Sequence, residues 1–177
     1  MSKPAPLLDR EGIEEAFRRL GERLAKRGVV ADIYVFGGAA MALAYDSRRA
    51  TRDVDALFKP HGIVLEEARA VAAELGLPNW WLNEQASSYA APSGDPSASR
   101  VFDHPGLRVF AASPEHLLAM KALAARPRDA QDIKQLTEVL NLHTVAEVLA
   151  LVQDVFPEEE PPPRLRLLLE DIFGQST

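Results

Sequence analysis

Two aspartates separated by one residue are the side chains whose chemistry is clearest in this sequence. Asp53 and Asp55 flank Val54 at the start of an apolar run that ends at Phe58. Because side chains alternate along an extended strand, we expect both carboxylates on one side and Val54 in the core. Two such carboxylates repel each other, and a divalent cation with oxygen ligands relieves the repulsion. The pair therefore predicts a site for Mg²⁺, with Mn²⁺ as the alternative ion.

Two adjacent glycines precede the aspartates and separate an apolar segment from a helical one. Gly37 and Gly38 follow a strand expected at 33–36 and lead into a helix expected at about 39–45. Glycine allows a phosphate to approach the backbone, and a helix N-terminus offers free N–H groups to an anion. Glycines and acids together predict a triphosphate held between backbone amides and a metal ion. The alternative is a plain turn followed by acids at a solvated strand end.

Four segments of the sequence resemble those of a known family. Residues 37–43, Gly-Gly-Ala-Ala-Met-Ala-Leu, and residues 49–55, Arg-Ala-Thr-Arg-Asp-Val-Asp, resemble the signature of the DNA polymerase β-like nucleotidyltransferases. The local sequence is similar to that of the bacterial branch that includes the AbiEii and MenT toxins. Residues 117–133 resemble the Lys-x-x-Ala-x-Arg and Arg-Asp-x-x-Asp segment of that branch. Segment 81–84 is similar to members known only as nucleotidyltransferase-like, and a shared fold does not establish activity.

The resemblance implies a metal site with a third carboxylate besides Asp53 and Asp55. Glu84 fits the expected order because it follows the apolar segment around Trp81. Asp103, in a hairpin expected at 100–111, is the alternative. An acid at the end of a strand is also commonly just solvated.

The resemblance also assigns nucleotide-binding residues. Lys121 matches the family lysine, and its compact ammonium suits a triphosphate. Thr51 and Arg52 precede the acids and are further candidates for phosphate contact, together with the two glycines. As alternatives, Lys121 is a surface lysine on a helix and Thr51 only starts a strand.

An acidic pair near a proline matches the second family segment. Asp129 and Asp132 are expected to orient Lys121 and Arg128 or to activate the acceptor hydroxyl. They would equally stabilise the N-terminus of the helix expected after Pro127, where acids are favourable.

Aromatic and histidine residues receive weaker assignments. Trp80 and Trp81 could stack a base, but one of two adjacent strand residues normally faces the core. The four histidines lie on different elements without metal-ligand spacing, so no role is assigned to them.

Composition limits the class of protein. The chain has 177 residues, 47% of them hydrophobic, and no cysteine, which excludes disulfides and cysteine nucleophiles. No apolar run reaches the roughly 20 residues of a membrane span, and the N-terminus lacks an export signal, so we expect a cytoplasmic protein. The net charge of −6 argues against extended coating of nucleic acid.

The expected architecture is α+β, with a small mixed sheet and flanking helices at 1–112 and a helical part at 113–177 packed on it. Capping and glycine signals place helices after Asp9, before Gly76, after Ser113 and after Thr144. Further expected elements are a helix from about 127, one over 164–173, a short strand at 79–83 and a hairpin of strands 100–103 and 107–111.

The expected activity is transfer of a nucleoside monophosphate from an NTP to a hydroxyl of RNA, such as a tRNA 3′ end, or of a protein. The resemblance implies a bacterial toxin–antitoxin or phage-defence setting with a cognate toxin or antitoxin partner. The alternative is a non-catalytic, antitoxin-type module that binds nucleotide or a partner protein.

Overall fold

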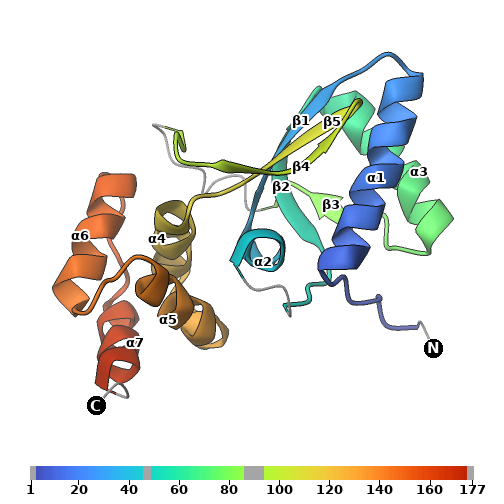
Figure 1. Ribbon diagram of the computed structural model, residues 1–177. Helices are drawn as coiled ribbons and strands as arrows, with labels where there is room; N and C mark the ends of the chain where they lie inside the picture. Colours follow the sequence, from blue (N-terminus) through green and yellow to red (C-terminus); the bar gives the residue numbers. More distant parts are fainter. Residues whose placement is uncertain (1–2, 46–48, 86–93, 175–177) are drawn as a thin grey trace. The chain divides into compact units, whose positions relative to one another are not determined.

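The computed structural model describes residues 3–45, 49–85 and 94–174 of the chain. Two compact units make up the fold. The first, here called the sheet unit, consists of residues 1–88 and 98–112, and the second, the helical unit, of residues 89–97 and 113–177. Figure 1 shows the elements of both units. Among the described residues, no helix has the length and apolar character needed to cross a membrane.

A five-stranded mixed sheet with the order β3-β2-β1-β5-β4 forms the centre of the sheet unit. The strands are β1 (Ala31–Phe36), β2 (Val54–Lys59), β3 (Leu82–Asn83), β4 (Ser99–His104) and β5 (Leu107–Ala111). The central strand β1 is antiparallel to β2 and parallel to β5. The edge strand β3 is parallel to β2, and β4 is antiparallel to β5. This sheet with its helices confirms the expected α+β class.

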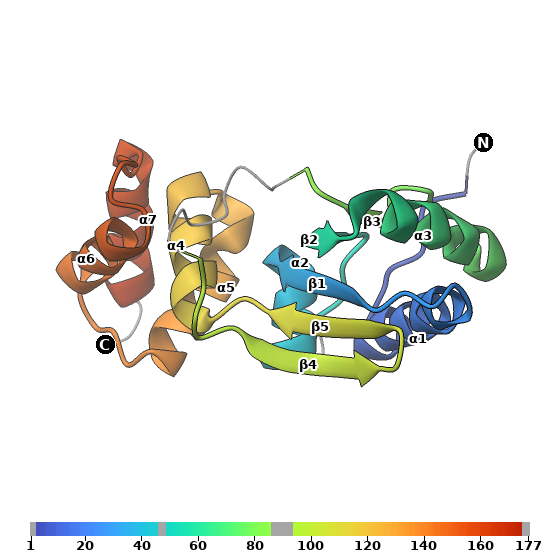
Figure 2. The same cartoon turned by 90° about the horizontal axis from the view of Figure 1, so that it is seen from above.

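Two helices, α1 (Arg10–Lys26) and α3 (His61–Leu75), lie side by side against the sheet (Figures 1 and 2). The carboxylate of Asp9 accepts a hydrogen bond from the Gly12 N–H over 2.8 Å and caps α1 as predicted. Gly76, at φ 67°, ends α3 in the left-handed conformation that glycine adopts readily. Both helix ends therefore follow local sequence signals.

Aromatic packing joins these helices to the sheet. The ring of Phe17 on α1 lies with its centroid 6.2 Å from that of Trp81 and 5.8 Å from that of Phe102. The Trp81 indole is fully buried and donates a hydrogen bond to the Ala68 carbonyl over 2.8 Å. Trp80, in contrast, is 48% exposed. The expectation that one of the two tryptophans faces the core is confirmed.

Two elements differ from expectation. The strand expected at 79–83 covers only Leu82–Asn83, because a turn closed by the Trp81 N–H and the Pro78 carbonyl precedes it. The helix expected at 39–45 begins earlier, as α2 (Gly37–Ala40), and continues as the π-helical turn η1 (Met41–Tyr45). The glycines therefore form the first turn of this helix.

The helical unit contains four α-helices and a short 3₁₀ turn within residues 94–97 and 113–174. They are α4 (Pro114–Ala124), η3 (Pro127–Asp129), α5 (Ala130–Val139), α6 (Val145–Val155) and α7 (Pro163–Gly174). Ser113 caps α4 by accepting from the His116 N–H, and Thr144 and Glu147 form the predicted capping box of α6. The interruption predicted at Pro127 is present, because α4 ends before it.

Candidate active site

The turn between β1 and α2 brings Gly37 next to Asp55. Asp55 pairs with Phe36 in the register of β1 and β2, one residue before the turn. Gly37 has a φ of 66°, which L side chains rarely adopt, and a Cβ built on it would lie 3.4 Å from Asp55 Oδ2. The Asp55 carboxylate therefore faces the glycine turn, and the strand that carries it positions it there.

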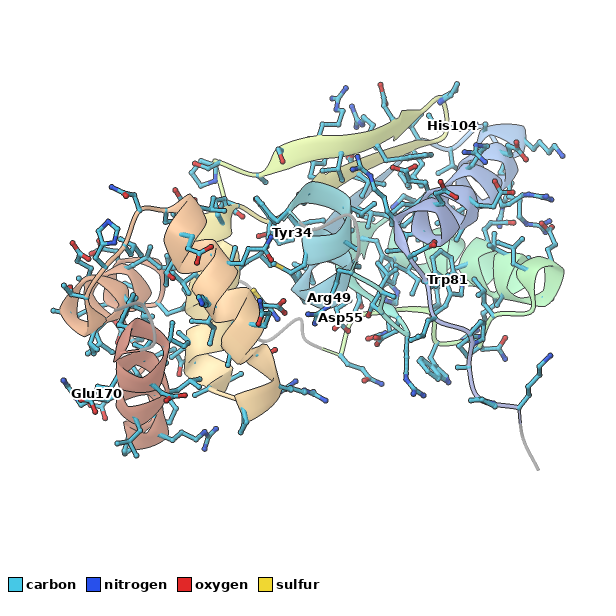
Figure 3. All side chains as sticks on the ribbon, turned by 60° about the horizontal axis from the view of Figure 1, so that its bottom comes forward. Tyr34, Arg49, Asp55, Trp81, His104 and Glu170 are labelled. Atoms are coloured by element: carbon cyan, nitrogen blue, oxygen red, sulfur yellow. The ribbon has the colours of Figure 1, made fainter. Side chains whose placement is uncertain are left out.

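The second glycine lies close to the loop that leads into β2. A Cβ on Gly38 would lie 3.2 Å from Thr51 Oγ1 and 4.0 Å from the Arg49 guanidinium. Figure 3 labels Arg49 and Asp55 next to one another beside α2. The N-cap residue of α2 is Phe36, whose side chain has no acceptor for the first-turn N–H groups. Backbone donors and an arginine thus border the same small region.

The other aspartate is held by a side chain that the sequence interpretation did not single out. Asn83 donates a hydrogen bond from Nδ2 to Asp53 Oδ2 over 2.9 Å. In the β2–β3 pairing Asn83 stands opposite Asp55, so its amide lies beside both acids of the motif. Thr51 Oγ1 donates to the Asp53 carbonyl over 3.0 Å and fixes the loop before β2. The sequence signal that could have identified Asn83 is its place in segment 81–84, which resembles nucleotidyltransferase-like proteins.

The donor set of these two aspartates suits a hard divalent cation. Both side chains are half-buried, and Mg²⁺ in nucleotide sites commonly takes one or two carboxylates together with substrate phosphates. Among the described residues, no group of three or more acidic, histidine or cysteine side chains gathers in a metal-binding arrangement. Asp53 and Asp55 would hold the ion, and the structure does not add a third carboxylate to them.

The two candidates for a third carboxylate lie elsewhere in the sheet unit. Glu84 Oε2 is 2.8 Å from His61 Nε2, at the first residue of α3. Asp103 lies on the edge strand β4, at the opposite end of the strand order from β3, and forms an exposed ion pair with Arg100 at 3.6 Å. Asn83, an amide, occupies the position on β3 that pairs with Asp55.

Comparison with known proteins identifies the family of the chain. A family model described as "Nucleotidyltransferase of unknown function (DUF6036)" matches residues 13–168. The chain belongs to this family. A solved structure, "Crystal structure of an antigenic nucleotidyltransferase-like protein from Paracoccidioides brasiliensis", is similar at 14% identity and a TM-score of 0.42, covering 97% of this chain and 91% of that one. No curated protein with a similar sequence was found.

In this member of the family, the helical unit gathers three of the predicted residues. Lys121 Nζ lies 3.0 Å from Asp129 Oδ1 and 2.9 Å from Asp132 Oδ2. All three residues are at most 8% exposed. The ammonium thus binds two carboxylates at the junction of α4, η3 and α5. The side chain of Asp129 forms no capping hydrogen bond at the start of α5.

Two further residues that were predicted to bind nucleotide, Arg52 and Arg128, are exposed. Arg52 lies in the loop of the sheet unit immediately before Asp53, and Arg128 lies in η3 of the helical unit. Neither forms an ion pair with a carboxylate in the part of the chain that the structure describes. Both guanidinium groups are therefore available to an anionic ligand.

Proposed function

We propose that the protein is a Mg²⁺-dependent nucleotidyltransferase that transfers a nucleoside monophosphate from an NTP to a hydroxyl. The observation that carries the proposal is the position of the Asp55 carboxylate against Gly37, with Asp53 two residues away. This arrangement combines a glycine turn for phosphate with acids for a metal ion, and family membership is consistent with it.

The residues of the sheet unit would act mainly by positioning and by balancing charge, which is what phosphoryl transfer requires. The N–H groups of the first turn of α2 would donate to the triphosphate, and Thr51, Arg49 and Arg52 border its path. When bound to Asp53 and Asp55, Mg²⁺ would supply charge neutralisation at the phosphates. Asn83 keeps the Asp53 carboxylate oriented.

The reaction forms one bond and breaks one. The acceptor hydroxyl oxygen bonds to the α-phosphorus, and the bond from that phosphorus to the bridging oxygen of the β-phosphate breaks. Pyrophosphate leaves with the electron pair, and the hydroxyl proton passes to water. The acceptor must lie in line with the leaving pyrophosphate, so it enters from the side of the α-phosphate away from the rest of the triphosphate.

The biological setting proposed is a bacterial toxin–antitoxin or phage-defence system, with the 3′ end of a tRNA as the first acceptor and a protein hydroxyl as the second. The resemblance of residues 37–55 and 117–133 to AbiEii and MenT toxins supports this setting. In such a system a cognate partner protein would control the activity.

The experiment is transfer of label from each NTP, labelled at the α-phosphate, to bulk tRNA or to proteins of a cell extract in the presence of Mg²⁺. Transfer should disappear with EDTA and with Asp55→Asn, a substitution that keeps the size of the side chain. Asp154→Asn, on the exposed face of α6, is the matched control and should leave transfer unchanged. Labelling that survives Asp55→Asn would contradict the proposal.

A second candidate, a non-catalytic module that binds nucleotide or a partner protein, rests on two observations. Among the described residues no three-carboxylate metal cluster is present, and Lys121 is already bound by two acids. NTP binding measured by calorimetry without transfer to any acceptor would favour this module over the enzyme.

A further inference from the structure

A pocket of about 360 Å³ opens at the β3 edge of the sheet unit and is used by no step described above. Residues from β2, α3, β3 and the turn before β3 line it, including Phe58, Arg69, Trp80 and Asn83. One of these residues belongs to the candidate active site as well, because the Asn83 amide binds the Asp53 carboxylate. The pocket therefore begins at a residue that binds Asp53, one of the two proposed metal ligands.

The strand order places this pocket and the glycine turn on different sides of the acids. The turn of Gly37 and Gly38 follows β1, the acids belong to β2 and the residue before it, and the pocket borders β3. Since the sheet runs β3-β2-β1, the strand with the acids lies between the other two. The pocket thus lies on the β3 side of the acids. Phe58 and Leu82 of its lining share the strand face of Val54, and Asn83 connects the pocket to the Asp53 carboxylate.

Flat rings form two of the pocket walls. Trp80 lines the pocket and is 48% exposed. The His61 imidazole stacks on the Phe58 ring with 5.1 Å between centroids and 10° between planes. Glu84 holds the same imidazole through the 2.8 Å contact with Nε2. These rings offer stacking surfaces of the kind on which unpaired bases bind.

Polar groups complete the lining. Arg69 on α3 is exposed and forms no ion pair with an acid in the described ranges 3–45, 49–85 and 94–174. Its guanidinium is available to a phosphate or to a base face. Asn79 adds an amide group of the kind that pairs with base edges, whereas the Asn83 amide is bound to Asp53 and to the backbone of Trp80 and Gln85. The lining thus combines flat rings with one guanidinium, Arg69, and one carboxylate, Glu84, so a planar occupant whose phosphate lies at Arg69 matches it.

We propose that this pocket binds the terminal, unpaired nucleotide of an RNA acceptor, with its base against Trp80 and its phosphate near Arg69. The inference rests on the proposed nucleotidyltransferase function and selects RNA over protein as acceptor. The size of the pocket suits one nucleotide, and a footprint of that size agrees with a chain of net charge −6, which has no need of an extended basic surface. A base-paired end cannot stack in it, so the acceptor must be single-stranded at its end.

The test measures binding of a fluorescein-labelled single-stranded RNA of roughly six nucleotides to the full chain by anisotropy, without NTP. Trp80→Ala and Arg69→Ala should each weaken binding about tenfold. Arg10→Ala, which removes an exposed arginine of α1 outside the pocket, is the matched control and should bind as the parent chain does. Thermal unfolding checks that the variants fold, which the exposure of both side chains favours.

A second measurement locates the bound RNA. Unlabelled RNA should quench the intrinsic fluorescence of the parent chain but not of Trp80→Phe, in which the buried Trp81 is the remaining tryptophan. A blunt duplex of the same sequence and N-acetyl-tyrosinamide, a model for a protein acceptor, should leave the signal unchanged. Equal binding of the duplex, quenching by N-acetyl-tyrosinamide without quenching by RNA, or tight RNA binding by both alanine variants would each overturn the inference.

Assays of nucleotide transfer distinguish a failure of the pocket proposal from a failure of the proposed enzymatic function. RNA binding that depends on Trp80 and Arg69, without transfer from any NTP, would support the pocket and contradict the enzyme. Transfer to RNA that Asp55→Asn abolishes, with the KM for RNA unchanged in Trp80→Ala, would support the enzyme and overturn the pocket. If both proposals hold, Trp80→Ala raises the KM for RNA and leaves the KM for NTP unchanged.

Discussion

The Asn83 side chain donates a hydrogen bond to Asp53 Oδ2 over 2.9 Å, between the short strand β3 and the residue that precedes β2. An amide thus stands where a third acid would place a further negative charge beside Asp53 and Asp55. The arrangement keeps the number of carboxylates at two and binds one of them through a neutral donor.

Asn83→Asp should make the stability of the chain depend on Mg²⁺. The substitution replaces a hydrogen bond to a charged group by repulsion between carboxylates, so the free energy of unfolding in EDTA should fall by about 1–3 kcal/mol. Added Mg²⁺ should restore most of this loss, as measured by urea unfolding with and without the ion. Asn79→Asp, exposed in the turn before β3, is the control. Equal stability of both variants in EDTA would be incompatible with the described geometry.

Gly37→Ala should damage both folding and nucleotide binding. Alanine at a φ of 66° costs about 1–2 kcal/mol, and its Cβ would lie 3.4 Å from Asp55 Oδ2. We expect a lower melting temperature and weaker binding of a fluorescent ATP analogue. Gly62→Ala on α3 meets no atom within 4 Å and should leave both quantities nearly unchanged or raise stability slightly. Normal nucleotide binding by Gly37→Ala would argue that the turn does not receive phosphate.

Lys121→Met should destabilise the helical unit. The substitution leaves the buried carboxylates of Asp129 and Asp132 without their cation, and loss of one partner from a buried ionic group costs about 3 kcal/mol or more. Urea unfolding should show this loss, whereas Lys26→Met at the exposed end of α1 should change stability by less than about 0.5 kcal/mol.

The triple variant Lys121→Met, Asp129→Asn, Asp132→Asn tests whether the unpaired acids cause the loss of stability in Lys121→Met. Removing all the charges together should recover much of the stability lost in Lys121→Met, because no unpaired buried charge remains. If the triple variant were less stable than the single one, the cost would come from packing and not from the unpaired acids.

Glu67 should contribute stability that acid removes. Burial on α3 raises the pKa of this carboxyl, but hydrogen bonds from Arg23 at 2.6 Å and Arg27 at 3.1 Å outweigh it, so the pKa is lowered overall. A lowered folded-state pKa means that the contribution is present above the unfolded-state pKa of about 4.3 and is lost as the pH falls through the folded-state value. Glu67→Gln should therefore reduce the fall in stability between neutral pH and that acidic range, measured by urea unfolding at several pH values.

The neighbouring Glu66→Gln is the control for the pH prediction. Glu66 contacts the same Arg27 at 3.1 Å, but its side chain is 69% exposed. An exposed ion pair contributes little because water screens it. If Glu66→Gln altered the pH dependence of the free energy of unfolding as strongly as Glu67→Gln does, the burial of Glu67 would not explain its contribution.

Elements fixed by local chemistry were predictable from the sequence. Asp9 before α1, Ser113 before Pro114, the capping box at Thr144 and the glycine after α3 each satisfy backbone groups within a few residues. Such signals need no knowledge of distant contacts. The alternation around Val54 likewise predicted which side chains of β2 are buried.

The parts that sequence reasoning missed depend on pairing between distant segments. Asn83 meets Asp53 because β3 pairs with β2 in one register, and a shift of one residue would turn its amide to the other face. The contact of His61 with Glu84 likewise joins α3 to the residue after β3, so a histidine given no role lies in a pocket wall. Lys121 matched a family position, but its two buried partners depend on how α5 packs against α4.

The segment before α1 has a consequence for how the protein is prepared. Leu8 exchanges two backbone hydrogen bonds with Thr51, at 2.7 and 2.9 Å, and Thr51 supports Asp53 in turn. An N-terminal truncation that removes Leu8, or a bulky affinity tag fused close to it, would release the loop that carries the acidic motif. Recombinant samples tagged at the other end are therefore the appropriate material for enzymology.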